Sequence, residues 1–544
     1  MITGTLDPGA AAPLPPAVPP AIAAPASATV RLAVAAGGLW AAAYTVVCLA
    51  GEKFSTFYLG IAWQLVPYEI LRADPIRSVW YLHIQPPLWN LAIGVIGRWS
   101  PLPDAISLQL LQATFGVLAA ALLAVVLRRL SCRPWLALTL ALLATLNPEF
   151  MRNAFEPTYE MPVAFLLVAL VWALTWDRPG REFRSLMGVA SFATLVILTR
   201  SLYHPVWALA IVALVAWAYR DALPWKRIGV AFLVPLVLAG GWMLKNEVMF
   251  GRATMSSWFG MNLQRGVIPV LPLAEKQQMF DEGKISGVAM IGPFGNYDLY
   301  RPVMPPCTPE HTHPALTKEL RDNPVVIPNL NYECFLPVYD QAGKDAIAVI
   351  KAYPGVWLKG REWSARVWFA TNQGPDSSPS WPYRQLSKVY RAIRLDVPGK
   401  LSTTDWGTPI YGPLSVDTRF SLTMVNLTLF AFAYGHLSAW SIVRRRRDAA
   451  FRGGNRTRTL VLAVVGATAL WTFVIGVVGE LGEQARFRTM TDPLVLAIGI
   501  AEVLRWLAPK LPHRVSDYLF DATGVPEPTQ ESEPEPEPWV QVSS

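Results

Sequence analysis

Trp80–Asn90 reads WYLHIQPPLWN, where a loop of mixed polar and aromatic residues gives way to an apolar run. Pro86 and Pro87 fix the backbone φ angle and lack an N–H donor, so they suit the first turn of a helix and no later position. The stretch therefore predicts a helix entrance. This entrance holds the titratable His83 and the amide Gln85 at the mouth of a membrane segment.

The composition of the chain indicates lipid as its solvent. Of 544 residues, 53% are hydrophobic and only 16% are charged, and 22 are Trp. Soluble domains carry about 25% charged residues, and the apolar residues here cluster in long runs. We therefore predict an all-α polytopic membrane protein. The formal net charge of +8 does not indicate a nucleic-acid partner, because the basic residues lie in short loops between apolar runs, where they act as topology signals.

Eleven apolar segments are candidate spans. They lie at 31–50, 86–98, 105–127, 134–147, 159–176, 185–199, 203–219, 228–245, 421–442, 459–479 and 489–507. A helix of about 20 apolar residues crosses a bilayer. The shorter segments are expected to be tilted or to span only part of it.

The positions of these segments predict the tails, loops and domains of the rest of the chain. Residues 1–29 are rich in Pro and Ala and lack the basic start of a cleaved signal peptide, so they predict a disordered tail. The first loop, 51–85, has apolar residues at the spacing of short amphipathic helices on the membrane surface. We expect a transmembrane core at 30–247 that includes this loop, a small extracytoplasmic domain at 248–420, the last spans at 421–508, and a cytoplasmic, acidic, Pro-rich tail at 509–544.

Loop charges predict the orientation. The basic connections 128–133, 177–184, 220–227 and 443–458 are placed in the cytoplasm. One conflict remains, because a full crossing by 86–98 would put 128–129 on the wrong side. The segment 86–98 is expected to be too short to cross simply, but the sequence does not decide this.

The four cysteines show no metal-ligand spacing. Cys307 and Cys334 lie in one long loop and could pair if that loop is oxidised, which the sequence leaves open. His311 and His313, spaced HTH, could bind a metal, but an exposed pair in a loop is the favoured interpretation.

Polar residues gather at the predicted extracytoplasmic ends of the spans, in the first loop and in four turns: NPEFMRNAFEPTYEMP, TRSLYHP, GGWMLKN and GELGEQARFRTMTDP. Taken singly, most such groups form interfacial salt bridges or reach to lipid headgroups. Together, acids on the first loop and cations from three distant segments suit transfer from a lipid-linked phosphate. A hydroxyl nucleophile needs a carboxylate base, and the departing phosphate needs fixed cations.

The order of these motifs resembles a known family. HIQPPLWN resembles the HxQPPLxN variant of the (K/H)xxPPL signature of the protein O-mannosyltransferase and lipid A aminoarabinose transferase superfamily, which are GT-C fold, family 39-like glycosyltransferases. NPEFMRNAFEPTYEMPVAFLL is similar to their second periplasmic turn, and LTRSLYHP to the turn with a phosphate-binding cation. FGRATMSSWFGMNL and GEQARFRTMTDPL also resemble bacterial members, so the ordered set covers about 50–500.

The resemblance implies a polyprenyl-phosphate sugar donor, a base on the first loop and inversion at the anomeric carbon. The base candidates are Asp74 and Glu69, with Glu52 ranked third, because many relatives carry two acids where this chain has Gly51, Glu52 and Lys53. The candidates for binding the donor phosphate are His83, Gln85, Arg200, His204, Lys245, Arg486 and Arg488, with Glu156, Tyr159 and Glu483 as further cavity residues.

The sequence therefore predicts a glycosyltransferase of the bacterial inner membrane, with its active site on the extracytoplasmic face and a lipopolysaccharide, glycan or protein as acceptor. The alternatives are a transporter or flippase for a lipid-linked substrate, for which inverted repeats would be expected, and an oligosaccharide ligase or polymerase. No cofactor is firmly predicted. A divalent cation stays open, since Glu69 and Asp74 are five residues apart and would not share a helical face well.

Overall fold

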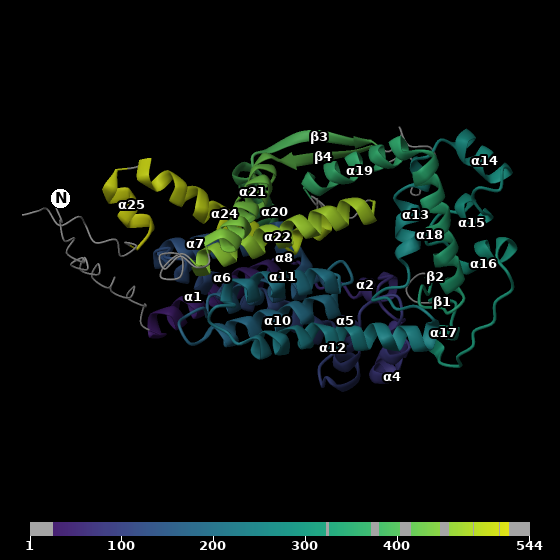
Figure 1. Ribbon diagram of the computed structural model, residues 1–544, viewed down its shortest axis with the longest axis horizontal. Helices are drawn as coiled ribbons and strands as arrows, with labels where there is room; N and C mark the ends of the chain where they lie inside the picture. The colour runs from purple at the N-terminus through teal and green to yellow at the C-terminus, as the bar shows by residue number, and fades with distance from the viewer. Residues whose placement is uncertain are drawn as a thin grey trace, which may run out of the picture.

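The chain forms an elongated helical body (Figure 1). The computed structural model describes residues 26–321, 326–371, 380–402, 415–445, 456–481, 484–510 and 512–521. In these residues the sheet structure consists of two short antiparallel pairs, β1 (Leu320–Arg321) with β2 (Ile327–Pro328) and β3 (Asp396–Ser402) with β4 (Ser415–Ser421). Long helices form one part of the body, and a lobe of shorter helices lies at its right-hand end in Figure 1.

Every predicted span is a helix in the structure. The helices are α1 (Ala26–Leu49), α5 (Pro87–Trp99), α6 (Asp104–Arg129), α7 (Pro134–Thr145), α9 (Glu160–Leu174), α10 (Glu182–Thr199), α11 (Pro205–Tyr219), α12 (Trp225–Phe250), α21 (Leu422–Arg445), α22 (Arg456–Gly479) and α24 (Asp492–Leu507). Six of them, α1, α6, α10, α12, α21 and α22, are long and apolar enough to cross a membrane, and α7, α9 and α11 are shorter apolar helices. The prediction of an all-α polytopic membrane protein is confirmed.

Glycines allow neighbouring spans to pack closely. Trp40 of α1 packs so tightly on Gly116 of α6 that an added Cβ there would lie 2.3 Å from the indole ring. Gly435 of α21 and Gly466 of α22 meet backbone to backbone, and an added Cβ at Gly435 would lie 2.6 Å from Cα of Gly466. Between helices in lipid there is little hydrophobic driving force, so packing through small residues is what brings them together.

Helix α5 does not cross the bundle. It packs along α3 (Tyr68–Ala73) and α4 (Pro75–Trp80), which with α2 (Phe57–Ile61) are the short helices of the first loop. Gly97, near the end of α5, lies against the ring of Tyr68, and Arg72 pairs with Asp104 at the start of α6 at 3.2 Å. Both ends of α5 thus lie beside the first loop.

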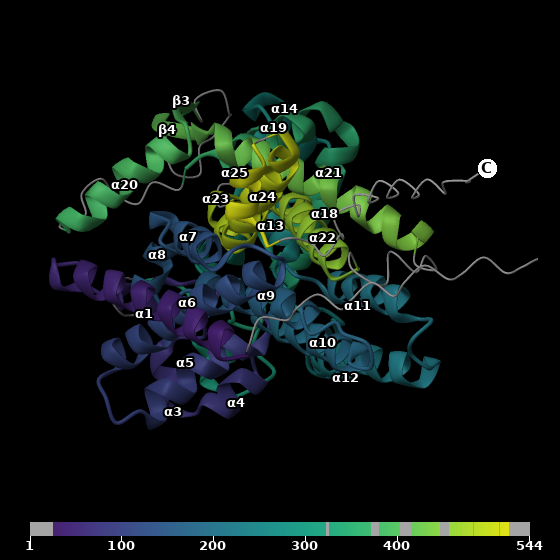
Figure 2. The same ribbon diagram turned by 90° about the vertical axis from the view of Figure 1, so that its left-hand side faces the viewer.

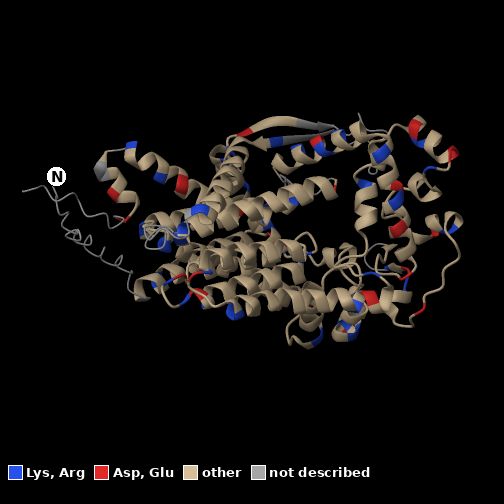
Figure 3. Cartoon of the chain, in the orientation of Figure 1, with Lys and Arg blue, Asp and Glu red and all other residues tan. Residues whose placement is uncertain are grey.

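A non-crossing α5 removes the conflict over orientation. The connections at 128–133, 177–181 and 220–224 then all fall at one end of the bundle, which we call the basic end. Figure 3 shows the long helices mostly without charge, Lys and Arg at their left-hand ends, and both signs of charge in the right-hand lobe. At the basic end Asp521 pairs with Arg128 and with Arg133, so α25 (His513–Leu519) is fastened to the loop after α6.

The predicted terminal tails fall largely outside the described residues. Helix α1 begins at Ala26, inside the stretch 1–29 that was predicted as a tail. At the other end, residues 513–519 form α25, and the acidic stretch 525–539 lies beyond the part of the chain that the structure describes.

The lobe is built from the long loop between α12 and α21. Its helices include α13 (Phe259–Arg265), α14 (Leu273–Asp281), α15 (Gly287–Met290), α16 (Tyr297–Tyr300), α17 (Pro314–Thr317), α18 (Phe335–Ala352) and α19 (Pro354–Phe369). Phe335, Tyr339 and Tyr300 are almost fully buried and form its aromatic core. Helix α20 (Trp381–Ile393) and the β3–β4 pair follow and lie back along the bundle.

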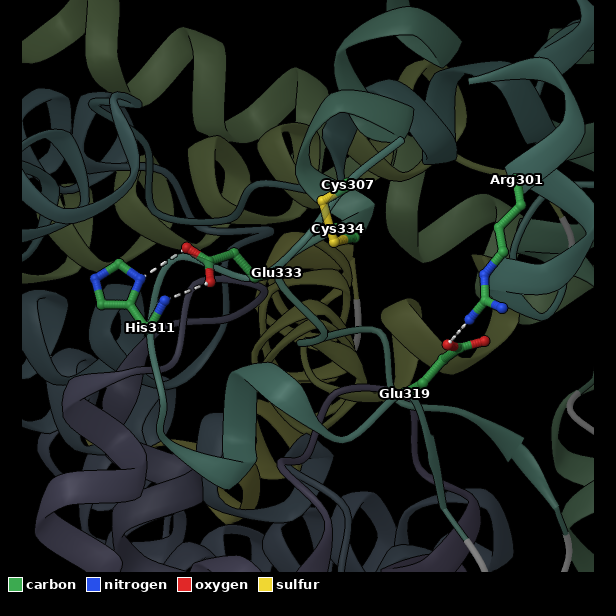
Figure 4. Close-up of a disulfide and its surroundings, with 6 residues drawn as sticks. All are labelled: Arg301, Cys307, His311, Glu319, Glu333 and Cys334. Carbon is green, nitrogen blue, oxygen red and sulfur yellow. Dashed lines mark hydrogen bonds and ion pairs between the residues drawn. A yellow bond between two sulfur atoms is a disulfide. The ribbon is translucent and has the colours of Figure 1, made fainter. Parts of the chain in front are cut away.

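A disulfide between Cys307 and Cys334 closes a segment of the lobe (Figure 4). The sequence left this pairing open. Nδ1 of His311 lies 2.7 Å from Oε1 of Glu333, next to the disulfide, and Nδ1 of His313 accepts from the backbone N–H of Ala315. In the part of the chain that the structure describes, no three His, Cys, Asp or Glu side chains are grouped to hold a metal ion.

The disulfide-closed segment contacts the WYLH stretch of the first loop through hydrogen bonds and a ring stack. Asn331 accepts from the backbone N–H of His83 at 3.0 Å and donates to the carbonyl of Tyr81 at 3.1 Å. The ring of His313 stacks on Tyr81 with centroids 4.7 Å apart. The lobe therefore sets the position of the residues that lead into α5.

Gly466→Ala is expected to destabilise the protein. Its Cβ would lie 2.4 Å from the carbonyl oxygen of Ala431 and 2.5 Å from Cα of Gly435, so α21 and α22 would have to separate. Overpacking of this kind costs about 1–3 kcal/mol. Thermal unfolding in detergent should show a lower Tm. Gly241→Ala in α12 is the matched control, because no atom lies within 4 Å of its added Cβ. Equal Tm values for the two variants would contradict the packing argument.

Candidate active site

The turn between α7 and α9 is the centre of the candidate site. It contains α8 (Pro148–Arg152) and η1 (Asn153–Phe155), and Asn147 caps α8 by accepting from the N–H of Glu149 at 3.1 Å. The amide of Gln112 in α6 donates to the carbonyls of Glu156 and Thr158. Trp89 of α5 donates to the carbonyl of Pro157 at 3.2 Å, so the PPLW helix packs directly on this turn.

Three arginines meet at the end of this turn. We call Arg152, Glu156, Tyr159, Glu160, Arg200 and Arg486 the arginine cluster. Nε of Arg152 lies 3.2 Å from Glu156, and Nε of Arg486 lies 2.7 Å from Glu160. The cluster is formed by residues from the turn, from the end of α10 and from α23 (Gln484–Thr489).

Tyr159 lies at the centre of the cluster. The guanidinium carbon of Arg200 lies 3.8 Å from the centroid of its ring, and that of Arg486 lies 5.3 Å from it. The Tyr159 side chain is buried, and its hydroxyl has no hydrogen-bond partner among the described residues. A buried hydroxyl normally has a partner, so the Tyr159 hydroxyl is unusual in this respect.

Gln85 of the opening stretch lies beside the cluster. Its Oε1 accepts from the hydroxyl of Ser201 at 3.1 Å, and Ser201 follows Arg200 in the chain. The side chain of Gln85 is buried. The structure thus brings Gln85, Arg200, Arg486, Glu156 and Tyr159 together, and all five were candidates from the sequence.

His83 is placed differently from Gln85. Nδ1 lies 2.6 Å from the Ser257 hydroxyl and Nε2 lies 3.1 Å from the carbonyl oxygen of Asn331. A carbonyl only accepts, so Nε2 carries the proton and Nδ1 accepts from Ser257. Burial, reinforced by the charge of Lys245, lowers the pKa of His83 to about 3. The imidazole is therefore neutral and adds no positive charge for a phosphate.

Lys245 and His204 also have local partners. Nζ of Lys245 donates to the carbonyls of Trp80 and Leu82, at 3.1 and 2.7 Å, and so holds the stretch before His83. His204 caps α11 by accepting from the N–H of Val206, and its side chain is exposed. Neither residue contacts the arginine cluster in the described interactions, and their predicted role at the phosphate stays a prediction.

Arg488 belongs to a buried charge network. It donates to Glu149 at 2.6 Å, to Asp492 at 3.2 Å, and to the carbonyls of Trp368 and Ala370. Arg394 adds a second bond to Glu149 at 2.6 Å. These contacts fix α23, on which Arg486 lies two residues before Arg488.

Asp74 and Glu69, the first two candidates for the base, lie on the exposed surface of the first loop. Asp74 caps α4 by accepting from the N–H of Arg77 at 3.1 Å, and Glu69 lies in the first turn of α3. No described contact joins either residue to the arginine cluster. Glu483 lies outside the described residues.

Glu52 lies beside the cluster and is only half buried. The N–H of Ser55 donates to the carbonyl of Phe155 at 2.8 Å, so the start of the first loop runs along the turn. Burial raises the pKa of the Tyr383 hydroxyl, Arg152 lowers it and Glu52 raises it again, which places both charges near the same ring. Among the first-loop acids, Glu52 is thus the one that the described interactions link to the arginine cluster.

Sequence reasoning missed two residues that support the site. Burial and the charge of Glu156 raise the pKa of the Tyr58 hydroxyl, while Arg152, its hydrogen-bond partner, lowers it. Gln112 holds the turn from α6. The signal for Gln112 was visible as an amide within an apolar segment, since polar groups in spans usually have a function. Tyr58 had no such signal.

Comparisons with known proteins show likeness to solved membrane glycosyltransferases at low similarity. Neither a protein-family model nor a curated protein sequence matches the chain. The chain is similar to the S. cerevisiae protein O-mannosyltransferase Pmt1-Pmt2 complex bound to the sugar donor, with 13% identity, a TM-score of 0.30, and coverage of 43% of this chain and 36% of that chain.

Two further solved structures cover most of this chain. The Archaeoglobus fulgidus oligosaccharyltransferase in the apo form has 14% identity, a TM-score of 0.40, and coverage of 89% of this chain and 52% of that chain. ArnT from Cupriavidus metallidurans, bound to undecaprenyl phosphate, has 14% identity, a TM-score of 0.31, and coverage of 90% and 82%. The chain thus spans about a third of the O-mannosyltransferase and half of the oligosaccharyltransferase. At these scores the similarity carries no conclusion about substrate or mechanism.

Arg488→Met is expected to lower stability by about 3–5 kcal/mol, because it leaves the carboxylates of Glu149 and Asp492 buried without this cation. The measurement is the Tm of the purified protein in detergent. Arg98→Met in α5 is the control, since Arg98 is exposed. A loss of Tm no greater than that of the control would show that the network does not hold α23.

Proposed function

We propose that this protein is a membrane glycosyltransferase that moves one sugar from a polyprenyl-phosphate donor to an acceptor hydroxyl. The observation that carries the proposal is the meeting of Arg200 and Arg486 on the ring of Tyr159. Two guanidinium groups and a buried hydroxyl that has no hydrogen-bond partner among the described residues form a set of donors for a phosphate group. The motif HIQPPLWN, which resembles that of the family, lies directly against the same turn through Trp89.

The chemistry of transfer explains why cations are needed. The bond from the anomeric carbon to the phosphate oxygen breaks, and the polyprenyl phosphate leaves with one more negative charge than it had in the donor. Arg200 and Arg486 stabilise this charge as it develops, and the Tyr159 hydroxyl donates to a phosphate oxygen. Glu160 keeps Arg486 in position through their ion pair. Gln85, held by Ser201, lies within the same surroundings.

The base in this proposal is Glu52. Its carboxylate takes the proton of the acceptor hydroxyl, which attacks the anomeric carbon from the side opposite the phosphate and so inverts its configuration. The half-buried position of Glu52 beside the turn supports this choice over Asp74 and Glu69. Asp74 and Glu69 are exposed, and no described contact joins them to the arginine cluster.

The proposed location is the extracytoplasmic face of a bacterial inner membrane. Basic loops remain preferentially in the cytoplasm, and the arginine cluster lies toward the opposite end of the spans. The disulfide Cys307–Cys334 lies in the lobe at that opposite end, which suits an oxidising compartment. The acceptor is proposed to be a lipopolysaccharide, another glycan or a protein.

Glu52→Gln is expected to reduce sugar transfer by about 10²–10⁴-fold, the usual contribution of a general base. Asp74→Asn and Glu69→Gln are expected to retain most activity. Transfer is measured in detergent with a purified polyprenyl-phosphate sugar, where a flippase would show no turnover. Each variant is checked for an unchanged Tm. Full activity of Glu52→Gln, or loss only in Asp74→Asn, would reject Glu52 as the base.

Arg486→Gln is expected to weaken binding of polyprenyl phosphate by about 10–100-fold, because a hydrogen bond to a charged group contributes about 1.5–3 kcal/mol. Binding of the lipid phosphate is measured directly by titration, without turnover. Arg366→Gln on α19 serves as the control, since that side chain is 61% exposed and pairs only with Glu362 among its described contacts. Equal affinity in both variants would remove Arg486 from the phosphate site.

A further inference from the structure

Helix α20 (Trp381–Ile393) takes no part in the proposed reaction. Its sequence, WPYRQLSKVYRAI, contains three basic residues and no acid. Figure 2 shows α20 reaching out from the side of the bundle that lies opposite α10 and α12. It contacts α1, α8 and β3.

One face of α20 is anchored to the bundle. Tyr383 and Tyr390 are seven residues apart, two turns, and both are buried. The Tyr383 hydroxyl donates to the carbonyl of Pro148 at 2.6 Å, and the Tyr390 hydroxyl donates to the carbonyl of Leu143. Leu143 lies in the last turn of α7, so α20 lies across the helix end that faces away from the basic end.

The two flanks of α20 differ in chemistry. At 100° per residue, Val389 and Ile393 lie on one side of the tyrosine stripe, and Arg384 and Arg391 lie on the other, with Lys388 next to them. Val389 is 55% exposed and Ile393 is 39% exposed. Trp381, at the start of the helix, is 63% exposed. An exposed apolar flank beside a basic flank is the pattern of a helix that lies in a membrane interface.

We propose that α20 is an interfacial helix that binds acidic phospholipid in the leaflet away from the basic end. Its apolar flank enters the acyl region, and the exposed Lys388 contacts the phosphates of the headgroups. The charge of α20 favours an acidic phospholipid over a neutral one, because the helix contains three cations and no carboxylate. The position of α20 favours lipid over a protein as the binding partner. The helix lies across the ends of membrane helices, at the boundary where lipid is already present.

This lipid contact would bear on the arginine cluster. Arg394, directly after α20, donates to Glu149, which in turn pairs with Arg488 on α23. The same turn, through Pro148, receives the Tyr383 hydroxyl. A lipid that holds α20 in place therefore supports the turn and α23 together.

The test uses the full chain in nanodiscs. In a Cys48→Ser, Cys132→Ser background, Val389→Cys carries an environment-sensitive fluorophore, and quenching is compared between brominated phosphatidylglycerol and brominated phosphatidylcholine at equal content. We expect strong quenching, with phosphatidylglycerol quenching more at low salt and the difference fading at high salt. Lys388→Gln should lower this preference by about fivefold, the effect of one cation near a membrane surface, and Lys388→Arg should keep it.

The matched control is the same label at Ile347→Cys, on α18 of the lobe, where the side chain is 47% exposed. It should show little quenching by either lipid. No quenching at position 389 would overturn the proposal and leave that flank for a protein partner. Equal quenching by both lipids, unchanged by salt or by Lys388→Gln, would overturn the recognition of acidic headgroups.

Discussion

Arg488 and Glu149 form an ion pair 2.6 Å long between positions 339 residues apart in the sequence. In apolar surroundings an isolated charge costs several kcal/mol, so each such group must meet an opposite charge or a carbonyl. Arg488 meets Glu149, Asp492 and two backbone carbonyls. Because α23 is a six-residue helix, fixing Arg488 also fixes Arg486, and with it one side of the arginine cluster.

Polar groups of the first loop are likewise paired with partners from the rest of the chain. Lys245 and Asn331 satisfy the carbonyls of Trp80, Tyr81 and Leu82, and His83 is bonded on both ring nitrogens. Pro86 and Pro87 then begin α5, and Trp89 of α5 donates to the carbonyl of Pro157 in the turn that precedes Tyr159. A series of hydrogen bonds thus connects the disulfide-closed segment of the lobe, through the first loop and α5, to the candidate site.

Much of the fold could be predicted because apolar length is a local property. Each of the eleven apolar segments is a helix, whereas the sequence left open whether 86–98 crosses. Individual roles were harder to predict. The family resemblance for His83 and the position of Lys245 predict contacts with a phosphate, a role that stays a prediction. In the structure both side chains contact backbone carbonyls. Every residue carries a carbonyl, so the sequence holds no sign of these partners. Asp74, ranked above Glu52, caps a helix at the surface.

The sequence by itself determined the membrane class and the helices, because these follow from apolar length. The packing of α5 beside the first loop was needed to place all the basic loops at one end of the bundle. Only the tertiary structure decided which polar groups meet in one cluster. Arg486 and Arg488 have the same chemistry and lie two residues apart, yet about 200° of helix rotation separates them. One enters the buried network with Glu149, and the other reaches Glu160 and Tyr159. That choice depends on the path of the whole backbone, which brings distant turns together.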